Sequence, residues 1–195
     1  QTINFTLDPI EGFTRHDVAA VLIKPTQGGV VKNTDVGEKF EIKIPAGALG
    51  NASDSNSVST KVTTAIVPKT ETVQVLGGKG IEITAKNSSG TVVTNFSSTG
   101  DSGVTITIPY TDADVAALSI EESKLKVGVW STAKAQWELL STTVDTAQNI
   151  LKATTQHFSV FASIAPKTTA SVSRSAQQQS LTAATPTILS TPVVQ

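Results

Sequence analysis

The chain of 195 residues contains no cysteine. This absence excludes a disulfide framework, a thiol nucleophile and thiolate metal ligands together. An excess of charge of one sign is also missing, because 15 Lys and Arg face 16 Asp and Glu and no dense basic run occurs. The sequence therefore lacks the electrostatic signature of a nucleic-acid-binding protein, and we expect no nucleic acid among its partners.

Long hydrophobic runs are absent as well. No apolar stretch approaches the roughly 20 residues that a membrane-spanning helix needs, so we expect no membrane span. The sequence starts at Gln1 rather than Met, and the commonest reason for such a start is the removal of a signal peptide. We expect a secreted or cell-surface protein of bacterial origin, and the abundance of Ser, Thr, Gly, Asn and Val agrees with that setting.

What the chain does have is a repeated pattern of period two, in which short runs of alternating apolar residues are separated by turn residues such as Pro45 and Gly77. Clear examples are Ile3, Phe5 and Leu7; Phe40, Ile42 and Ile44; and Val104, Ile106 and Ile108. The pattern predicts an all-β fold, an antiparallel two-sheet β-sandwich. A single short helix is predicted at Thr111–Leu118, with Asp112 and Asp114 near its start.

The sequence divides into three parts. Residues 1–35 contain N-terminal strands that we expect to pack on the sandwich or to be exchanged with it. Residues 36–164 form the predicted sandwich. Residues 165–195 are an extended tail that is rich in Ser, Thr and Gln and has the composition of a linker.

The tail carries four apolar residues that could form a short terminal strand: Ile188, Leu189, Val193 and Val194. An extended segment of this kind can add itself to the exposed sheet edge of a neighbouring chain. It can equally fold back on its own domain. We take these four residues as the candidate assembly site and leave both arrangements open.

Three stretches carry a resemblance to a known family. The first is Ile42–Leu49, where a strand ends in a Pro-Ala-Gly-Ala-Leu corner. The second is Val104–Tyr110, which also ends at a proline, and the third joins Trp137–Leu140 to His157–Phe161. In this order and spacing they resemble the ZU5 domain and the related repeats of bacterial cell-surface proteins, over residues 36–164. The resemblance implies an extracellular β-sandwich.

The sequence His157-Phe158-Ser159 raises the question of self-cleavage. In some ZU5 relatives a His-Phe-Ser sequence cleaves itself between Phe and Ser. The resemblance would make Ser159 the nucleophile that attacks the Phe158 carbonyl carbon, with His157 as the general base. The alternating pattern favours a structural role instead. It places Val160 and Ile164 on the buried face of the last strand and Ser159 and Ser163 on the other. We expect no enzymatic activity and keep self-cleavage as an alternative.

Other candidate sites have simpler structural explanations. Glu121 and Glu122 are adjacent on a turn and point in different directions, unlike the carboxylate pair of a glycoside hydrolase. Asp112 and Asp114 lack the further ligands of an EF-hand calcium loop. Residues 77–80, Gly-Gly-Lys-Gly, lack the spacing of a phosphate-binding loop. We expect no metal site and no cofactor.

Aromatic residues are scarce, at 5% of the chain. Trp130 and Trp137 could form a sugar-stacking platform, although tryptophans in sandwich strands are more often core residues. A glycan-binding module would use Trp130 or Tyr110 on an exposed face.

These observations favour a non-enzymatic structural subunit of an extracellular surface assembly, most specifically a filament. Its partners would be copies of itself, joined by strand or tail exchange, and contacts that do not close on themselves produce open assemblies of this kind. Other surface proteins or glycans are further candidate partners. The alternatives are a glycan-binding surface module and an autoproteolytic domain that cleaves at His157-Phe158-Ser159.

Overall fold

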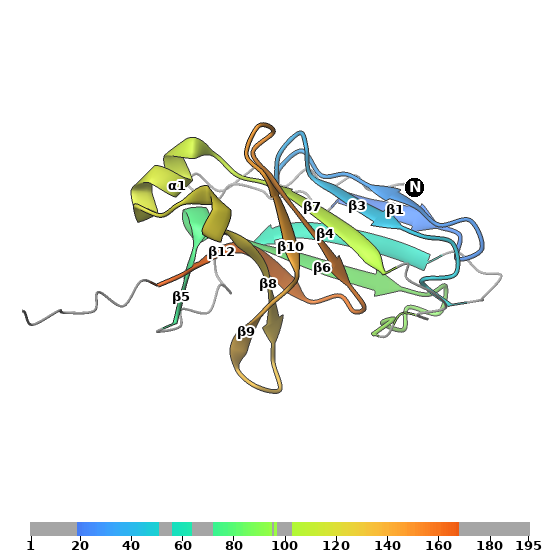
Figure 1. The fold of residues 1–195 in the computed structure, drawn as a ribbon. Helices are drawn as coiled ribbons and strands as arrows, with labels where there is room; N and C mark the ends of the chain where they lie inside the picture. The colour runs from blue at the N-terminus through green and yellow to red at the C-terminus, as the bar shows by residue number, and fades with distance from the viewer. Residues whose placement is uncertain (1–18, 51–55, 64–71, 95, 97–102, 168–195) are drawn as a thin grey trace, which may run out of the picture.

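The computed structural model describes residues 19–50, 56–63, 72–94, 96 and 103–167. These residues form twelve strands in two antiparallel sheets and one α-helix. Figure 1 shows the two sheets as facing layers, with the helix at one end. The predicted all-β two-sheet sandwich is therefore confirmed.

The larger sheet contains seven strands. Six follow the spatial order β1 (Ala19–Ile23), β4 (Asn56–Thr63), β6 (Gly80–Lys86), β12 (Val160–Pro166), β8 (Lys126–Ser131) and β9 (Gln136–Leu139). The seventh, β5 (Val73–Val75), pairs with the last three residues of β12, while β6 pairs with the first two. The central strand β12 thus has two partners in succession along one side.

The smaller sheet contains five strands, in the order β10 (Thr142–Asp145), β11 (Ile150–Thr155), β7 (Val104–Pro109), β3 (Glu41–Ile44) and β2 (Gly29–Val31). The tight turn at Gly28 leads from β1 in the larger sheet to β2 in the smaller one. Gly28 has a φ of 68°, and a Cβ there would overlap the carbonyl oxygen of Ile44. Only glycine fits this turn without strain.

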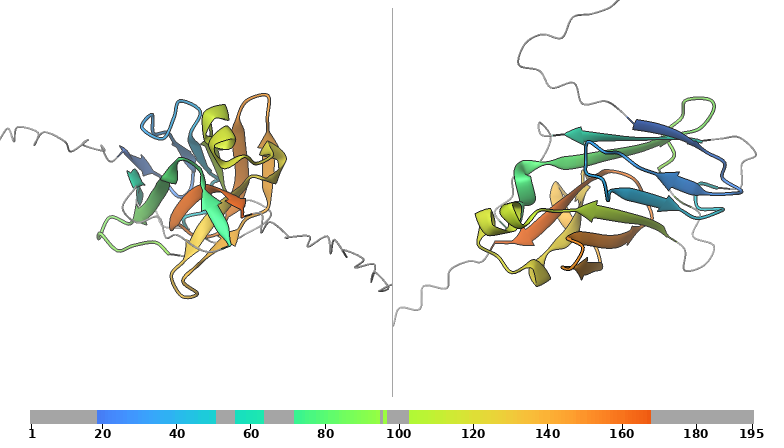
Figure 2. Two further views of the ribbon diagram at one scale, coloured as in Figure 1. Left: turned by 90° about the vertical axis from the view of Figure 1, so that its left-hand side faces the viewer. Right: turned by 90° about the horizontal axis from the view of Figure 1, so that it is seen from above.

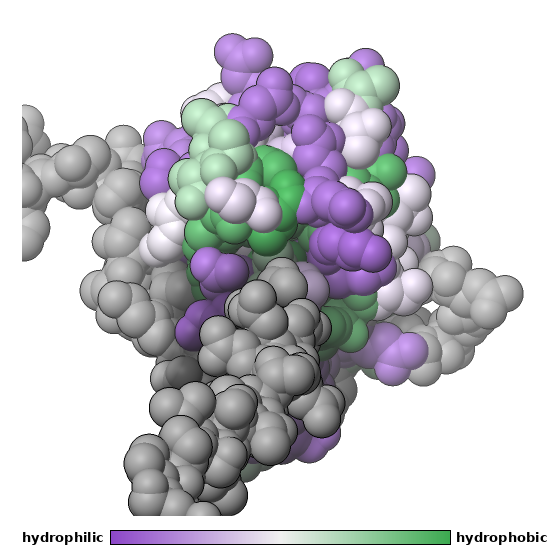
Figure 3. Space-filling view, turned by 60° about the vertical axis from the view of Figure 1, so that its left-hand side comes forward, coloured by the Kyte–Doolittle hydropathy of each residue, from purple (hydrophilic) through white to green (hydrophobic). Residues whose placement is uncertain are grey.

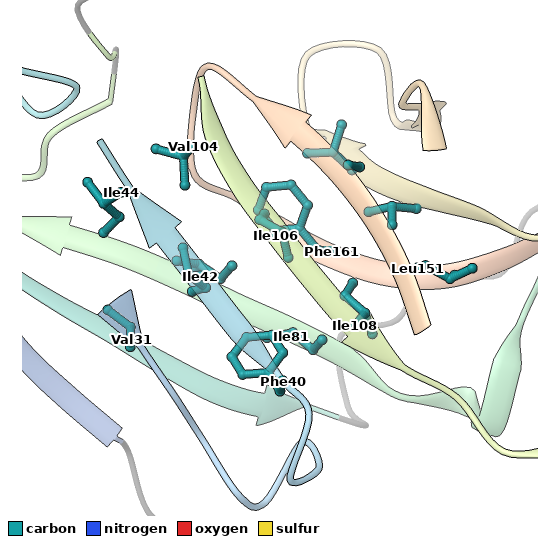
Figure 4. Packing of buried hydrophobic residues seen from close by; sticks show 14 of the residues in the cluster. Val31, Phe40, Ile42, Ile44, Ile81, Val104, Ile106, Ile108, Leu151 and Phe161 are labelled. Carbon is teal, nitrogen blue, oxygen red and sulfur yellow. The ribbon is translucent and has the colours of Figure 1, made fainter. Parts of the chain in front are cut away.

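The main core lies between the two sheets (Figure 4). Period-two alternation turns one side chain in two toward it. In β3, for example, Ile42 and Ile44 are buried while Lys43 is exposed. The largest fully buried side chains are Phe40, Phe161, Ile42, Ile106, Leu125, Leu151 and Ile164. Each such side chain contributes about 1.5–3 kcal/mol through its removal from water.

β12 is buried on both faces, which differs from the single buried face that the sequence pattern predicts. Phe161 and Ala165 pack in the core between the sheets. Because residues two apart in a strand share a face, Ser163 lies on that same inner face. It is 8% exposed.

The outer face of β12 is covered by a second, smaller cluster. Ala162 and Ile164 are buried there together with Trp137 from β9. Gly128 on the neighbouring strand β8 makes room for them, since a Cβ at this position would overlap the side chain of Ile164. This tryptophan cover is the reason that β12 has no polar face.

The helix α1 (Asp112–Leu118) confirms the predicted helix. Its N-cap is Thr111, whose Oγ1 accepts a hydrogen bond from the backbone N–H of Asp114 at 3.1 Å. Val115 is buried, and the helix ends at Ser119 in the left-handed region, with a φ of 52°. Two short 3-10 turns, η1 (Leu76–Gly78) and η2 (Glu122–Lys124), complete the fold. Figure 2 shows α1 at one end of the sandwich.

The N-terminal region and the tail are only partly described. β1 and β2, from the predicted region 1–35, are integral strands of the two sheets. The alternating residues Ile3, Phe5 and Leu7 lie outside the described residues. The same holds for the four candidate assembly residues of the tail, Ile188, Leu189, Val193 and Val194.

Candidate functional site

The segment His157-Phe158-Ser159 is the turn that connects β11 to β12. Thr155 holds both ends of the His157 backbone: its hydroxyl donates to the His157 carbonyl at 2.9 Å and accepts from the His157 N–H at 3.4 Å. The ring of Phe158 meets Phe96 edge to face, with 4.5 Å between ring centroids. The segment is therefore anchored by the Thr155 hydroxyl and by the Phe158 ring.

The Ser159 hydroxyl is engaged with a backbone group. Its Oγ donates to the carbonyl oxygen of Trp130 at 2.8 Å, and its own carbonyl accepts from the N–H of Ile83 at 3.0 Å. None of residues 157–159 has a positive φ. Self-cleavage would require transfer of the Ser159 hydroxyl proton to a base. It would also require a distorted peptide bond between Phe158 and Ser159. This geometry favours the structural role of the segment.

His157 contributes instead to the surroundings of a surface carboxylate. The ammonium of Lys134, 2.8 Å from Glu138 Oε1, lowers the pKa of Glu138, and Ser131 and His157 lower it further. All four groups belong to the end of the sheet formed by the β8–β9 hairpin and the β11–β12 turn.

The two tryptophans have different environments. Trp130 and Trp137 lie directly opposite each other on β8 and β9, with 5.5 Å between ring centroids and 69° between ring planes. Trp137 is 6% exposed and belongs to the outer cluster. Trp130 is half-buried. Trp137 is thus a core residue, and Trp130 alone offers a surface to a ligand.

A groove of about 420 Å³ runs along the outer face of the larger sheet beside Trp130. Phe158 and Ser159 of the β11–β12 turn are among the residues that line it, together with Val92 and Thr94 from the segment after β6. The sequence pattern did not associate these segments with Trp130. A signal was nevertheless present in the sequence, because the adjacent apolar residues Val92 and Val93 interrupt the alternation after β6. In the structure Val92 is exposed.

Tyr110 is not on an exposed face. It is 7% exposed, and its hydroxyl donates to Glu122 Oε2 at 3.0 Å. Burial, followed by the neighbouring Glu122 carboxylate, raises the pKa of Tyr110 to about 12. A buried and bonded phenol cannot stack on a glycan, so this part of the glycan-binding alternative was wrong.

The acidic candidates have structural partners. Glu122 accepts from Tyr110, whereas its neighbour Glu121 is exposed. Asp112 accepts from Asn149 Nδ2 at 2.7 Å, and Asp114 Oδ2 accepts from the Thr111 hydroxyl at 2.7 Å. In the part of the chain that the structure describes, no three metal-binding side chains of the His, Cys, Asp or Glu type lie together.

The outer edge of β1 is an apolar strand edge at one end of the larger sheet. β1 reads Ala-Ala-Val-Leu-Ile and contains no charged residue. It pairs with β4 on one side, and no described strand pairs with its other side. Leu22 is 73% exposed, the highest value among the large apolar side chains that the structure describes. A row of free backbone groups beside such residues is a template for pairing with another strand.

None of the helices described here is long and apolar enough to cross a membrane. No protein-family model matches the chain, and no curated protein matches it either. The resemblance to the ZU5 domain therefore depends on the three motifs alone. Two of them lie side by side, because β3 of the first pairs with β7 of the second.

Proposed function

We propose that this chain is a non-enzymatic structural subunit of an extracellular surface assembly, a filament whose subunits exchange extended segments. The observation that carries the proposal is the outer edge of β1, which is apolar, free of charge and unpaired among the described residues. Natural sheet edges normally carry charges, prolines or bulges that prevent association. Within Ala19–Ile23, which Lys24 and Pro25 follow, such protection is absent, and this supports a strand that is meant to be paired.

The sequence supplies segments that could pair with this edge. Ile3, Phe5 and Leu7 alternate with polar residues as an added strand requires, and the tail offers Ile188, Leu189, Val193 and Val194. Either segment, donated by one subunit to the next, would make a contact that repeats without closing. The low charge of the chain and the ZU5 resemblance support a place outside the cell, on a bacterial surface.

The direct test is electron microscopy of the purified chain over a range of concentrations, with intact mass measured on the same sample. We expect filaments of full-length chains. The variant Leu22→Lys places a charge on the β1 edge without disturbing the core and should prevent filament formation. The matched control is Leu139→Lys, on the opposite edge of the same sheet, where the leucine is 53% exposed. Monomers of the unaltered chain at every concentration would rule out the proposal.

A second candidate function is glycan binding, which the groove beside Trp130 favours. One half-buried tryptophan in a groove of about 420 Å³ could stack on a single sugar ring. Quenching or shift of tryptophan fluorescence during a glycan screen is the test, with Trp130→Ala as the variant that should lose it. An unchanged signal across the screen would remove this candidate.

A further inference from the structure

A cavity opens between the two sheets at the end of the sandwich that carries α1. Its volume is about 270 Å³. Leu76, Ile81 and Ile108 give it an apolar lining from both sheets, and Asp114 of α1 stands at its rim. Figure 3, which turns this side of the molecule forward, shows hydrophobic side chains gathered between hydrophilic ones.

Ser163 places a polar hydroxyl in the otherwise apolar inner wall of the cavity. It occupies an inward position of β12 between Phe161 and Ala165, where an apolar side chain would complete the core. Among the described residues, its Oγ is the one buried side-chain nitrogen or oxygen atom that has no hydrogen-bond partner. A buried hydroxyl without a partner is unfavourable, and native structures rarely retain one without a reason. A docked group with a hydrogen-bond acceptor would supply the missing partner.

The lining selects for an aliphatic segment that carries little charge. Apart from its apolar wall, the cavity has two carboxylates, Asp35 and Asp114, and one ammonium group, Lys79, a net charge of −1. The tail from residue 168 to 195 contains one charged residue, Arg174, and includes the adjacent apolar pair Ile188-Leu189. The apolar side chains of Ile188 and Leu189 therefore match the apolar lining, and the tail carries no acidic side chain that the net negative charge of the cavity would repel.

The tail also leaves the fold close to the cavity. β12 ends at Pro166, three residues after Ser163, on the same side of the molecule as α1 (Figure 1). The N–H of Lys167 still donates to the carbonyl oxygen of Thr72 at 2.9 Å. An extended chain advances about 3.3 Å per residue, so the segment that leads to Ile188 can span roughly 70 Å. That length reaches the same cavity in an adjacent subunit.

We infer that this cavity is the acceptor site for the tail of a second copy. Ile188-Leu189 fills the apolar space, and a backbone carbonyl of the docked tail accepts from the Ser163 hydroxyl. The inference deepens the proposed function and rests on it, since it assigns the tail to the cavity and leaves the β1 edge to the N-terminal segment with Ile3, Phe5 and Leu7. A contact in which each tail enters the next cavity is heterologous and extends into a filament.

Because the chain has no cysteine, a pair of introduced cysteines can trap this contact. In the full-length variant Lys79→Cys/Leu189→Cys, oxidation should convert most chains into a ladder of dimers, trimers and longer species on a non-reducing gel. The matched control is Thr132→Cys/Leu189→Cys, which places the first cysteine at the rim of the groove beside Trp130. The control should give few cross-links under the same conditions.

Two gel results would overturn the inference. A monomer band of increased mobility would show that the tail enters its own cavity. Cross-linking no stronger than in the control, in samples that still contain filaments by electron microscopy, would remove the cavity as the acceptor and leave the proposed function intact. If the unaltered chain formed no filaments, by contrast, the proposed function itself would be wrong.

A second test uses variants that block each side of the contact. Ser163→Leu fills the cavity, Leu189→Asp places a charge on the tail, and each variant alone should raise the concentration needed for assembly at least about tenfold. An equimolar mixture should associate at a lower concentration than either variant alone, because one intact cavity and one intact tail remain. Thermal unfolding of Ser163→Leu checks that the variant is folded. Normal assembly of folded Ser163→Leu, or a mixture that stays monomeric, would contradict the inference.

Discussion

Tyr110 joins the smaller sheet to η2 through its bond to Glu122, and its ionisation can be followed alone because it is the only tyrosine in the chain. Its pKa is raised from 10.0 to about 12. A raised pKa means that the folded state favours the neutral phenol. The stabilisation is complete below pH 10, where the unfolded chain also keeps its proton, and is lost as the pH rises through about 12.

We therefore predict that phenolate absorbance of the folded protein develops about two pH units later than that of the protein in concentrated urea. The free energy of unfolding should fall across this same interval. In Tyr110→Phe the fall should be smaller, and stability at neutral pH should decrease by about 1.5–3 kcal/mol through the lost bond to a carboxylate. Coincident titration of the folded and unfolded protein would show that the phenol is not held by Glu122.

Ser159 allows the structural and the autoproteolytic roles to be separated by one substitution. Ser159→Ala removes the bond to the Trp130 carbonyl and should lower the free energy of unfolding by about 1 kcal/mol in denaturant titration. The exposed Ser141→Ala serves as the control and should change it by less than about 0.5 kcal/mol.

Intact mass provides the second readout for Ser159. We expect the same full-length mass for the unaltered chain and for Ser159→Ala after long incubation. Fragments that end at Phe158 in the unaltered chain, and their absence in Ser159→Ala, would establish self-cleavage instead.

At the scale of single elements, the cap of α1 is the simplest contribution to isolate. Thr111 binds the helix twice: Oγ1 accepts from the Asp114 N–H and donates to the Asp114 carboxylate. Thr111→Ala should cost about 1 kcal/mol, and Thr111→Ser should retain most of that stability because it keeps the hydroxyl. Denaturant titration of both variants checks this prediction, and equal losses would show that the methyl group rather than the cap matters.

The sequence pattern predicts a strand well where one face of the strand is exposed to solvent. β3 shows this clearly, because Ile42 and Ile44 are buried and Lys43 is exposed. It predicts β12 less well, because Trp137 of β9 packs against the outer face of β12 and buries it. Alternation within a strand carries no information about such a cover. The same limit explains why Ser163 was expected outside the core.

The candidate sites show the same division between local and long-range information. The helix and its cap could be predicted from residues 111–118, since capping is local. The groove beside Trp130 could not, because Phe158 reaches it only through the pairing of β12 with β8. The hydrogen bond of Tyr110 likewise could not be predicted, because its partner Glu122 lies on a separate turn. Contacts of this kind become visible only when the sheet order is known.

At the scale of the whole molecule, the balance of charge predicts how assembly should respond to salt. The net charge is −1, and the β1 edge carries no charge at all. Salt shortens the Debye length from about 10 Å at 0.1 M to about 3 Å at 1 M and weakens only charged contacts. Strand pairing and apolar burial should therefore persist. Ammonium sulfate should even favour assembly, because excluded salts strengthen apolar burial.

We predict that the concentration needed for assembly changes less than about threefold between 0.1 and 1 M sodium chloride, as measured by sedimentation of filaments. Leu22→Lys should fail to assemble at both salt concentrations, because its defect is the burial of a charge at the strand edge rather than long-range repulsion. If salt dissolved the filaments of the unaltered chain, or restored those of Leu22→Lys, the subunits would be joined by ionic contacts. The β1 edge would then not be the surface on which they associate.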